Sequence, residues 1–410
     1  MRRSHAVATV VTLSLGTAFG AGTSLAQVTA YEGARIIVGD GRAAMENATL
    51  VVDGARIVQV GTAATVRVPA GAARVNLAGK TVMPAIINTH EHLSQTREAL
   101  TLDLKRRAYF GVSASMSLGQ DVGEVLGMRG APMPGAARYF SAGRGITMPE
   151  PGRTQAPYWI NNAAEGRQAV QELAAKQVDI VKIWVDDRND MFKKITPEIS
   201  SAIINEAHAR GLRVTAHIFE REDAKALLRA GIDSFAHGIR DVDVDDETIT
   251  LFRQHPNIVL VPNLPDPGKR TDLAWLRGHI PVAEMTALEA ENTDRPQAQA
   301  AFGIQSRNLG RLNAAGVRIA LGTDGNTAWA PHTEMVDMVA SGMTPMQVIV
   351  AATRNGAEFL RMTDAGTLEV GKSADFLVLD ANPLDDITNT RRIAASYLRG
   401  AAVDRSQPPR

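Results

Sequence analysis

The sequence of 410 residues contains no cysteine. This absence excludes disulfide bonds, cysteine-based zinc sites and cysteine nucleophiles. Any metal ion that the chain binds must therefore be held by His, Asp, Glu or a modified Lys. A chain without cysteine also avoids stray oxidation in an oxidising compartment.

A net charge is missing as well, because 44 Lys and Arg residues balance 44 Asp and Glu residues. This balance gives no electrostatic reason to expect nucleic acid or an anionic membrane surface as a partner. Hydrophobic residues make up 45% of the chain and charged residues 21%, as in ordinary globular proteins. We therefore expect a folded protein without a nucleic-acid partner, and homo-oligomers stay open.

Long apolar runs are confined to the N-terminus. Arg2 and Arg3 precede an apolar stretch over residues 6–25, which ends in the small-x-small pattern Ser24-Leu25-Ala26. We interpret residues 1–26 as a signal peptide cleaved after Ala26. The alternative is a membrane anchor, although three glycines weaken this stretch as a spanning helix. The mature protein is expected in a bacterial periplasm or outside the cell, without membrane contact after cleavage.

The rest of the chain falls into three stretches by pattern. Residues 27–80 and 365–410 contain short β-like runs broken by Gly and Asp, which is typical of hairpins. Residues 81–364 alternate short apolar runs with helix-like stretches, which predicts βαβ units and a parallel sheet. The predicted fold class is α/β: a (β/α)8 TIM barrel with a small β-sandwich formed by both chain ends.

The central stretch offers one apolar run for each strand of such a barrel. We predict strands at 81–88, 111–117, 137–142, 179–184, 213–217, 234–237, 258–262 and 318–322. Helices are predicted at 196–210, 221–230 and 344–360. In a barrel, the carboxyl ends of the strands meet on one face, and that face carries active sites.

Polar residues stand at or near the ends of these strands. His90 and His92 follow the first strand, and residues two apart in extended chain face the same side, so both imidazoles can converge on one ion. Further polar residues occupy equivalent places on later strands: Lys182, His217, His237 and Asp324. A Lys inside an apolar strand is costly unless it is neutralised or paired.

This set of residues resembles that of the amidohydrolase superfamily. The segment TVMPAIINTHEH at 81–92 is similar to the family's first-strand signature, with Ala85 where Gly more often follows the Pro. The segment GKSADFLVL at 371–379 resembles the strand that returns to the small sandwich. The likeness covers nearly all of the mature chain. It is greatest to members like Xaa-Pro dipeptidase and imidazolonepropionase, in the binuclear subtype with a bridging lysine.

The resemblance implies a role for each residue of the set. His90, His92 and Asp324 would bind the more buried metal ion, and His217 and His237 the second. Lys182 would be N6-carboxylated and bridge the two ions. One or two divalent ions are thus implied; zinc suits the ligands best, with manganese, cobalt and iron open.

The same metal set suggests a mechanism. Water shared by two cations loses a proton near neutral pH, and Asp324 is the candidate to accept it and deliver it to the leaving nitrogen. Each member also has a simpler interpretation. His90 and His92 could be a structural pair, and Asp324 a turn residue. Lys182 could form an ordinary ion pair with Asp186 or Asp187, which would leave a mononuclear site.

Several residues near strand ends are candidates for the substrate pocket. Arg144 follows the third strand and could pair with a substrate carboxylate. An aromatic wall could be formed by Tyr158 and Trp184, with Trp159 beside them. Other candidates follow the last two strands: Asn263, His332 and Glu334.

The resemblance implies cleavage of an amide or related C–N bond in a small molecule. Candidate substrates are an N-acyl amino acid, a dipeptide, a cyclic amide or a xenobiotic amide. The loops after the third and fourth strands lack the Gly-Gly-rich stretches of the dipeptidases, which disfavours that specificity. An esterase or lactonase is the alternative on the same site. Alternatives of other classes are a catalytically silent relative used for binding or assembly and a periplasmic solute-binding protein.

Overall fold

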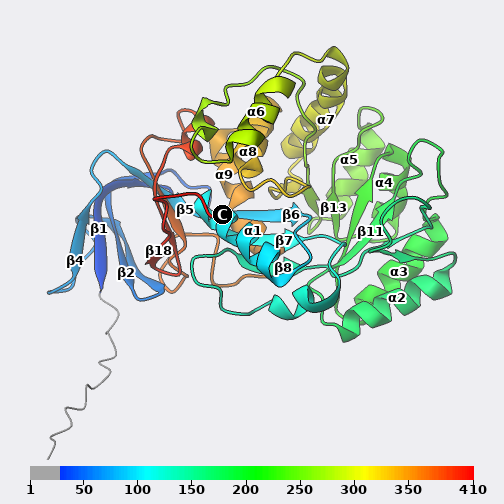
Figure 1. Cartoon of the computed structure of the whole chain (residues 1–410), viewed down its shortest axis with the longest axis horizontal. Coiled ribbons are helices and arrows are strands. Elements are labelled where there is room, and N and C mark those ends of the chain that lie inside the picture. The colour runs from blue at the N-terminus through cyan, green and yellow to red at the C-terminus, as the bar shows by residue number, and fades with distance from the viewer. Residues whose placement is uncertain (1–27) are drawn as a thin grey trace, which may run out of the picture.

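The structure, a computed structural model, describes residues 28–410 (Figure 1). The predicted signal peptide, residues 1–26, lies outside the described residues. None of the helices in residues 28–410 combines the length and the hydropathy that are needed to cross a membrane.

Strands from both ends of the chain pair in one sheet. Its order is β18-β17-β16-β5-β1-β2-β3, with β4 paired to β1, and Figure 1 shows the blue and red strands side by side. The bounds are β1 (Thr29–Ile36), β2 (Met45–Asp53), β3 (Arg56–Thr62), β4 (Ala73–Asn76), β5 (Thr81–Pro84), β16 (Phe376–Leu379), β17 (Ile393–Leu398) and β18 (Ala401–Ala402). The predicted layering of these strands as a sandwich stays a prediction.

The central strands form two further sheets in which every pairing is parallel. One has the order β6-β7-β8 and the other β10-β9-β11-β12-β13-β14-β15. The bounds are β6 (Ile86–Glu91), β7 (Val112–Ser117), β8 (Arg138–Ser141), β9 (Ile146–Thr147), β10 (Tyr158–Trp159), β11 (Val181–Val185), β12 (Val214–Ile218), β13 (Ser234–Ala236), β14 (Val259–Val261) and β15 (Arg318–Ile319). The strand pairing therefore defines two separate parallel sheets, and it does not by itself establish the single closed barrel that the sequence predicted.

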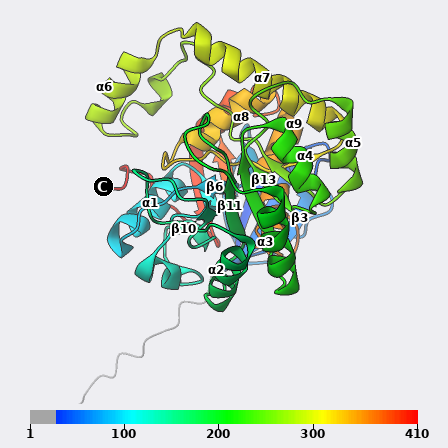
Figure 2. The ribbon, with the colours of Figure 1, turned by 90° about the vertical axis from the view of Figure 1, so that its right-hand side faces the viewer.

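The helices pack against these sheets through a core of Ile, Leu, Val and Ala side chains. They are α1 (Arg97–Tyr109), α2 (Ala163–Ala175), α3 (Pro197–Ala209), α4 (Arg221–Arg229), α5 (Asp246–Gln254), α6 (Val282–Glu291), α7 (Pro296–Ala314), α8 (Ala330–Ala340), α9 (Pro345–Ala352) and α10 (Arg354–Phe359), with 3-10 turns η1 (Gly123–Met128), η2 (Ala274–Leu276) and η3 (Ile387–Arg391). In Figure 2, α6 and α7 run along one edge of the molecule, away from α2 and α3.

Local sequence explains where several helices begin and end. The Thr196 side chain caps α3 by accepting the Ile199 N–H, and Pro197 follows at a position where no helical N–H is lost. Thr344 begins α9 in the same way, with a reciprocal capping box. The single helix predicted at 344–360 is wrong, because Thr353 leaves helical geometry (φ −132°, ψ −87°) and separates α9 from α10.

Candidate metal centre

The polar residues expected at the strand ends come from neighbouring strands of the two parallel sheets. His90 lies in β6, Lys182 in β11 and His217 in β12, whereas His237 directly follows β13. Asp324 lies beyond β15, and its backbone N–H donates to the His90 carbonyl across 2.9 Å. This backbone contact holds the chain after β15 against β6.

His90, His92 and Asp324 form a compact group. Asp324 Oδ1 lies 3.0 Å from His92 Nε2 and 3.7 Å from His90 Nε2. One ligand atom from each residue falls within 4.8 Å of the other two. Two imidazoles and a carboxylate in this arrangement could hold three corners of a divalent metal site. The Asp324 side chain is 41% exposed, so this side of the group is open.

Two further histidines extend the group along the strand ends. The ring centroids of His90 and His237 are 5.0 Å apart, and those of His237 and His217 are 4.6 Å apart. His237 Nε2 also lies 3.5 Å from Asp324 Oδ2. All of the predicted histidine ligands are therefore brought to one side of Asp324.

Lys182 is fully buried beside this group. Within the described residues, its Nζ has no hydrogen-bond partner, and it lies 5.3 Å from the ring of Trp184. Burial lowers the pKa of Lys182 to about 7, although the charge of Asp324 opposes the shift. The alternative of an ordinary ion pair is wrong, because Asp186 contacts Arg188 at 2.6 Å and Asp187 faces Lys194 at 3.7 Å.

The Nε2 atom of His217 contacts two neighbouring side chains. His217 Nε2 lies 2.7 Å from Asp186 Oδ2 and 3.1 Å from Arg188 Nη1. The His217 contact and the Arg188 N–H hold the pKa of Asp186 below its usual range, against the effect of burial. The sequence analysis did not place Asp186 and Arg188 in the site. Their position just after the carboxyl end of β11 could have identified them, because the strand ends carry the other site residues.

Burial also sets the charge of the metal-ligand candidates. It lowers the pKa of His90 and His237 well below the ordinary value and that of His217 to about 3. These rings are therefore neutral near pH 7, and a neutral imidazole offers a lone pair to a metal. Burial tends to raise the pKa of Asp324, but the neighbouring histidines His90, His92 and His237 lower it well below its usual range.

Several buried nitrogen atoms of the group have no partner within the described residues: His90 Nε2, His92 Nδ1, Lys182 Nζ and His237 Nδ1. Buried polar atoms normally find partners, so such a concentration at one place needs an explanation. A cation held with Asp324 would satisfy His90 Nε2, and carboxylation would give Lys182 Nζ a covalent partner. The residues therefore fit a metal centre.

Surrounding residues hold the histidines in place. Asn263 Oδ1 lies 2.8 Å from His90 Nδ1. Between His90 and His92, the fully buried Glu91 pairs with Arg107 at 2.8 Å, and Arg107 donates to Asn326. The sequence analysis assigned no role to Arg107 or Glu91. The sequence did contain a signal for this ion pair, because a charged residue such as Glu91 on a strand as apolar as β6 needs a buried partner.

Backbone strain gathers at the same strand ends. Positive φ values occur at His237 (135°), Asn263 (44°) and Asp324 (57°), which follow β13, β14 and β15 in turn. Asn and Asp enter the left-handed region more readily than most residues, so His237, whose φ of 135° lies outside that region, is the most strained of the three.

The sequence profile described as the amidohydrolase family matches residues 81–403, which is more than half of the chain. The chain belongs to the amidohydrolase family.

The sequence of this amidohydrolase is similar to that of a named enzyme and of an uncharacterised protein. Imidazolonepropionase of Streptomyces coelicolor is 27% identical over 369 residues, covering 82% of this chain and 86% of that enzyme. An uncharacterised protein of Mycobacterium tuberculosis is 29% identical over 259 residues, covering 60% of this chain and 64% of that protein. The chain thus matches just under two thirds of that relative's length.

A solved structure extends the likeness to the fold. A protein from Bifidobacterium longum assigned as a prolidase superposes with a TM-score of 0.76 at 29% identity, covering 94% of this chain and 97% of that one. Amidohydrolases are typically metal-dependent, in agreement with the His90, His92 and Asp324 group. The family and its named enzymes support a hydrolase that acts on carbon–nitrogen bonds.

Two of the pocket candidates adjoin the metal-ligand candidates of the amidohydrolase: Asn263, which contacts His90, and Trp184, which lies beside Lys182. The Trp184 ring contacts Gly119 and Gly145, where an added Cβ would come within 2.4 Å and 2.0 Å of ring atoms. The same Cβ on Gly119 would lie 3.0 Å from Lys182 Cγ, so the two glycines admit a large ring beside the buried Lys182 side chain. Trp184 is 8% exposed and therefore forms a wall of the Lys182 environment.

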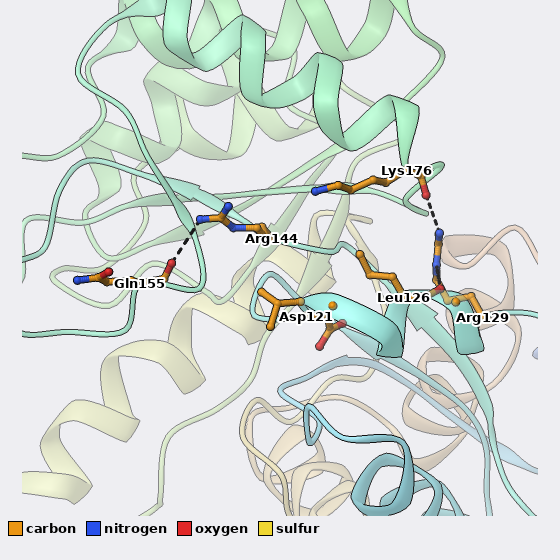
Figure 3. Close-up of a pocket in the computed structure, with 9 residues that line it drawn as sticks. Asp121, Leu126, Arg129, Arg144, Gln155 and Lys176 are labelled. Atoms are coloured by element: carbon orange, nitrogen blue, oxygen red, sulfur yellow. Dashed lines mark hydrogen bonds between the residues drawn. The ribbon is translucent and has the colours of Figure 1, made fainter.

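Arg144 and Tyr158 contact each other beside a second cavity. The Arg144 guanidinium lies 4.1 Å from the ring of Tyr158, and its Nη2 donates to the Pro157 carbonyl. Arg144 lines a cavity of about 610 Å³ together with Lys176 and Arg129. Figure 3 shows these three side chains. Backbone carbonyls accept from Nε and Nη2 of the guanidinium, and its predicted pairing with a substrate carboxylate stays a prediction.

His332 and Glu334, both in α8, have different roles. His332 is fully buried, with Nε2 at 2.9 Å from the Phe110 carbonyl and Nδ1 at 3.1 Å from Thr390 Oγ1. Both ring nitrogens are engaged, so the structure contradicts its prediction as a pocket residue. Glu334 instead accepts the Leu264 N–H, next to Asn263.

Proposed function

We propose that this amidohydrolase is a metal-dependent hydrolase that cleaves an amide or related C–N bond of a small molecule. The observation that carries this proposal is the group of His90, His92 and Asp324 beside the buried, unpaired amine of Lys182. A silent binding protein would have no need for this ligand set. Family membership and the imidazolonepropionase and prolidase relatives support the bond class.

We assign His90, His92 and Asp324 to one divalent ion and His217 and His237 to a second. Lys182, carboxylated on its Nζ, would bridge the two. The amine is suited to this modification, because its lowered pKa leaves a large neutral fraction near pH 7 to attack carbon dioxide. Imidazole and carboxylate ligands favour zinc.

A divalent ion in this site supplies Lewis acidity that eases the loss of a proton from water. Asp324 remains a carboxylate and is open on one side, so it can accept that proton and return it to the leaving nitrogen. Asn263 keeps His90 in one tautomer by accepting its Nδ1–H, which directs the Nε2 lone pair at the ion. Because Asp186 and Arg188 contact Nε2 of His217, this histidine would hold an ion through its other ring nitrogen, Nδ1, as long as both contacts are kept.

We also propose that the two parallel sheets close into one (β/α)8 barrel, with a β-sandwich built from both chain ends. Backbone hydrogen bonds at both seams support closure: Thr89 N–H to Leu321 O at 2.9 Å, and Asp179 N–H to Ser141 O at 3.0 Å. The TM-score of 0.76 to the Bifidobacterium protein agrees. A crystal structure that lacks contact at either seam would exclude the barrel.

The basic head and small-x-small pattern in residues 1–26 support export of the mature chain, to the periplasm or beyond. Fractionation of the expressing bacterium, with N-terminal sequencing of the product, tests this. A product that keeps residues 1–26 in the cytoplasm would contradict it.

The test of the activity begins with the metal content of the purified mature protein. We expect nearly two ions per chain in the wild type, a loss on Lys182→Ala, and no change in the control Lys105→Ala, whose side chain is exposed on α1. Hydrolysis of a panel of N-acyl amino acids and cyclic amides should fall with the metal. A protein that binds no metal after reconstitution would exclude the proposed function, and preference for esters would favour the esterase alternative.

A further inference from the structure

A cavity of about 280 Å³ is lined by residues of α6 and α8 and adjoins the metal centre. Thr323 lies in its wall, directly before Asp324, and donates its N–H to the His90 carbonyl across 3.1 Å. The lining also includes Leu264 and Trp329. A substrate with its scissile bond near Asp324 can therefore extend a side group into this cavity.

Asp337 lines the cavity with an unpaired carboxylate. Its residue is 7% exposed, and within residues 28–410 its side-chain oxygens make no hydrogen bond or ion pair. Burial raises its pKa to about 7, with a further contribution from Asp266 and an opposing one from Arg391. A buried carboxylate without a partner is costly, so this position points to a ligand that supplies one.

Glu334 lies one turn before Asp337 on α8 and is 5% exposed. Both of its oxygens share a single donor, the Leu264 N–H at 3.1 Å. A carboxylate has room for several more hydrogen bonds. Glu334 therefore adds unused acceptor capacity to the same cavity.

The other charges of the lining leave the cavity acidic. Its acids are Asp266, Glu291, Glu334 and Asp337, and its bases are Lys269 and Arg295. Arg295 is already engaged by Asp266. The buried carboxylates on α8 are thus not neutralised by the bases of the lining.

We propose that this cavity binds a cationic ammonium or guanidinium group of the substrate, with Asp337 and Glu334 as its acceptors. The proposal rests on the proposed function and names a substrate class for it: an amide that carries a basic group on an alkyl arm. Leu264 and Leu273 offer apolar contact to the arm, and Trp329 offers a ring face to the cation.

The test is calorimetric titration of the metal-loaded mature protein with three probes of equal length: butylammonium, 1-butanol and butanoate. Butylammonium should bind with saturation, whereas the neutral and anionic probes should not. Asp337→Asn and Glu334→Gln should each weaken its affinity about ten-fold, because each removes one charged acceptor. The control Glu289→Gln, on the exposed face of α6, should leave the affinity unchanged.

Equal binding of butylammonium and 1-butanol, or no binding of butylammonium, would overturn the proposal. Unchanged affinity in both α8 variants would also do so. If a thermal melt shows that one of these variants is unfolded, the affinity of the other variant for butylammonium tests the proposal. The titration needs no turnover, so cation binding without amide hydrolysis would reject the proposed function and leave the cavity assignment standing.

Discussion

Asn263 Oδ1 accepts the Nδ1–H of His90 across 2.8 Å, and this contact decides which ring nitrogen of His90 remains free. The free Nε2 faces Asp324. Because a carbonyl oxygen only accepts, the pair selects one imidazole tautomer. A loop residue after β14 thereby controls a ligand candidate on β6.

Replacement of Asn263 by Ala should lower metal affinity about 10- to 100-fold, because His90 loses its orientation and tautomer control. Competition with a chromogenic chelator measures this affinity. The control Asn313→Ala, at the end of α7, should bind metal as the wild type does. Equal affinities for both variants would show that Asn263 does not position His90.

Lys182 should take up carbon dioxide at Nζ. Its pKa of about 7 leaves a reactive neutral amine at physiological pH, and the carbamate forms with release of one proton. Protein reconstituted with metal in ¹³C-bicarbonate should show one carbamate resonance by NMR. The resonance should vanish in Lys182→Ala and persist in Lys105→Ala; its survival in the former would exclude Lys182 as the modified residue.

The ion pair of Arg107 and Glu91 is buried on both sides, with side chains 1% and 0% exposed. Arg107→Met should destabilise the fold by about 3 to 5 kcal/mol, because it leaves an uncompensated buried carboxylate. Chemical denaturation measures this loss. The double variant Arg107→Met, Glu91→Gln should recover part of it, and a double variant as unstable as the single one would assign the loss to packing instead.

Asp337 should make stability depend on pH. Its folded pKa of about 7 exceeds the ordinary value of 3.8, so the protonated form stabilises the fold at low pH. That contribution is complete below the unfolded pKa and is lost as pH rises through about 7. Asp337→Asn should therefore be more stable than wild type at pH 8, by on the order of 2 kcal/mol, and equal to it near pH 4.

Urea denaturation of both proteins across this range measures the difference. A difference that does not vary with pH would show that the pKa of Asp337 is not raised in the folded protein. The same comparison for Asp385→Asn, whose side chain is exposed, should give no pH-dependent difference.

Much of the fold was predictable because local chain preferences decide it. The alternation of apolar runs with helical stretches located β7, β8, β11, β12, β13 and β14 within a few residues, whereas the two-residue strands β9 and β10 were not predicted. The last predicted strand was too long, since β15 pairs only over Arg318–Ile319. Beyond this, the chain turns to bond with the backbone of His90, a long-range contact that no local pattern records.

The residue types alone set which ligands the chain can offer: no cysteine, a His-x-His pair, and a likeness to the amidohydrolase family that the profile over residues 81–403 confirms. Which of these side chains meet depends on the tertiary structure. It engaged both nitrogens of His332, covered His217 with Asp186 and left Asp337 without a partner. The reason is physical, because a residue type carries its donors and charge within it, whereas burial and partners depend on segments far apart in the chain.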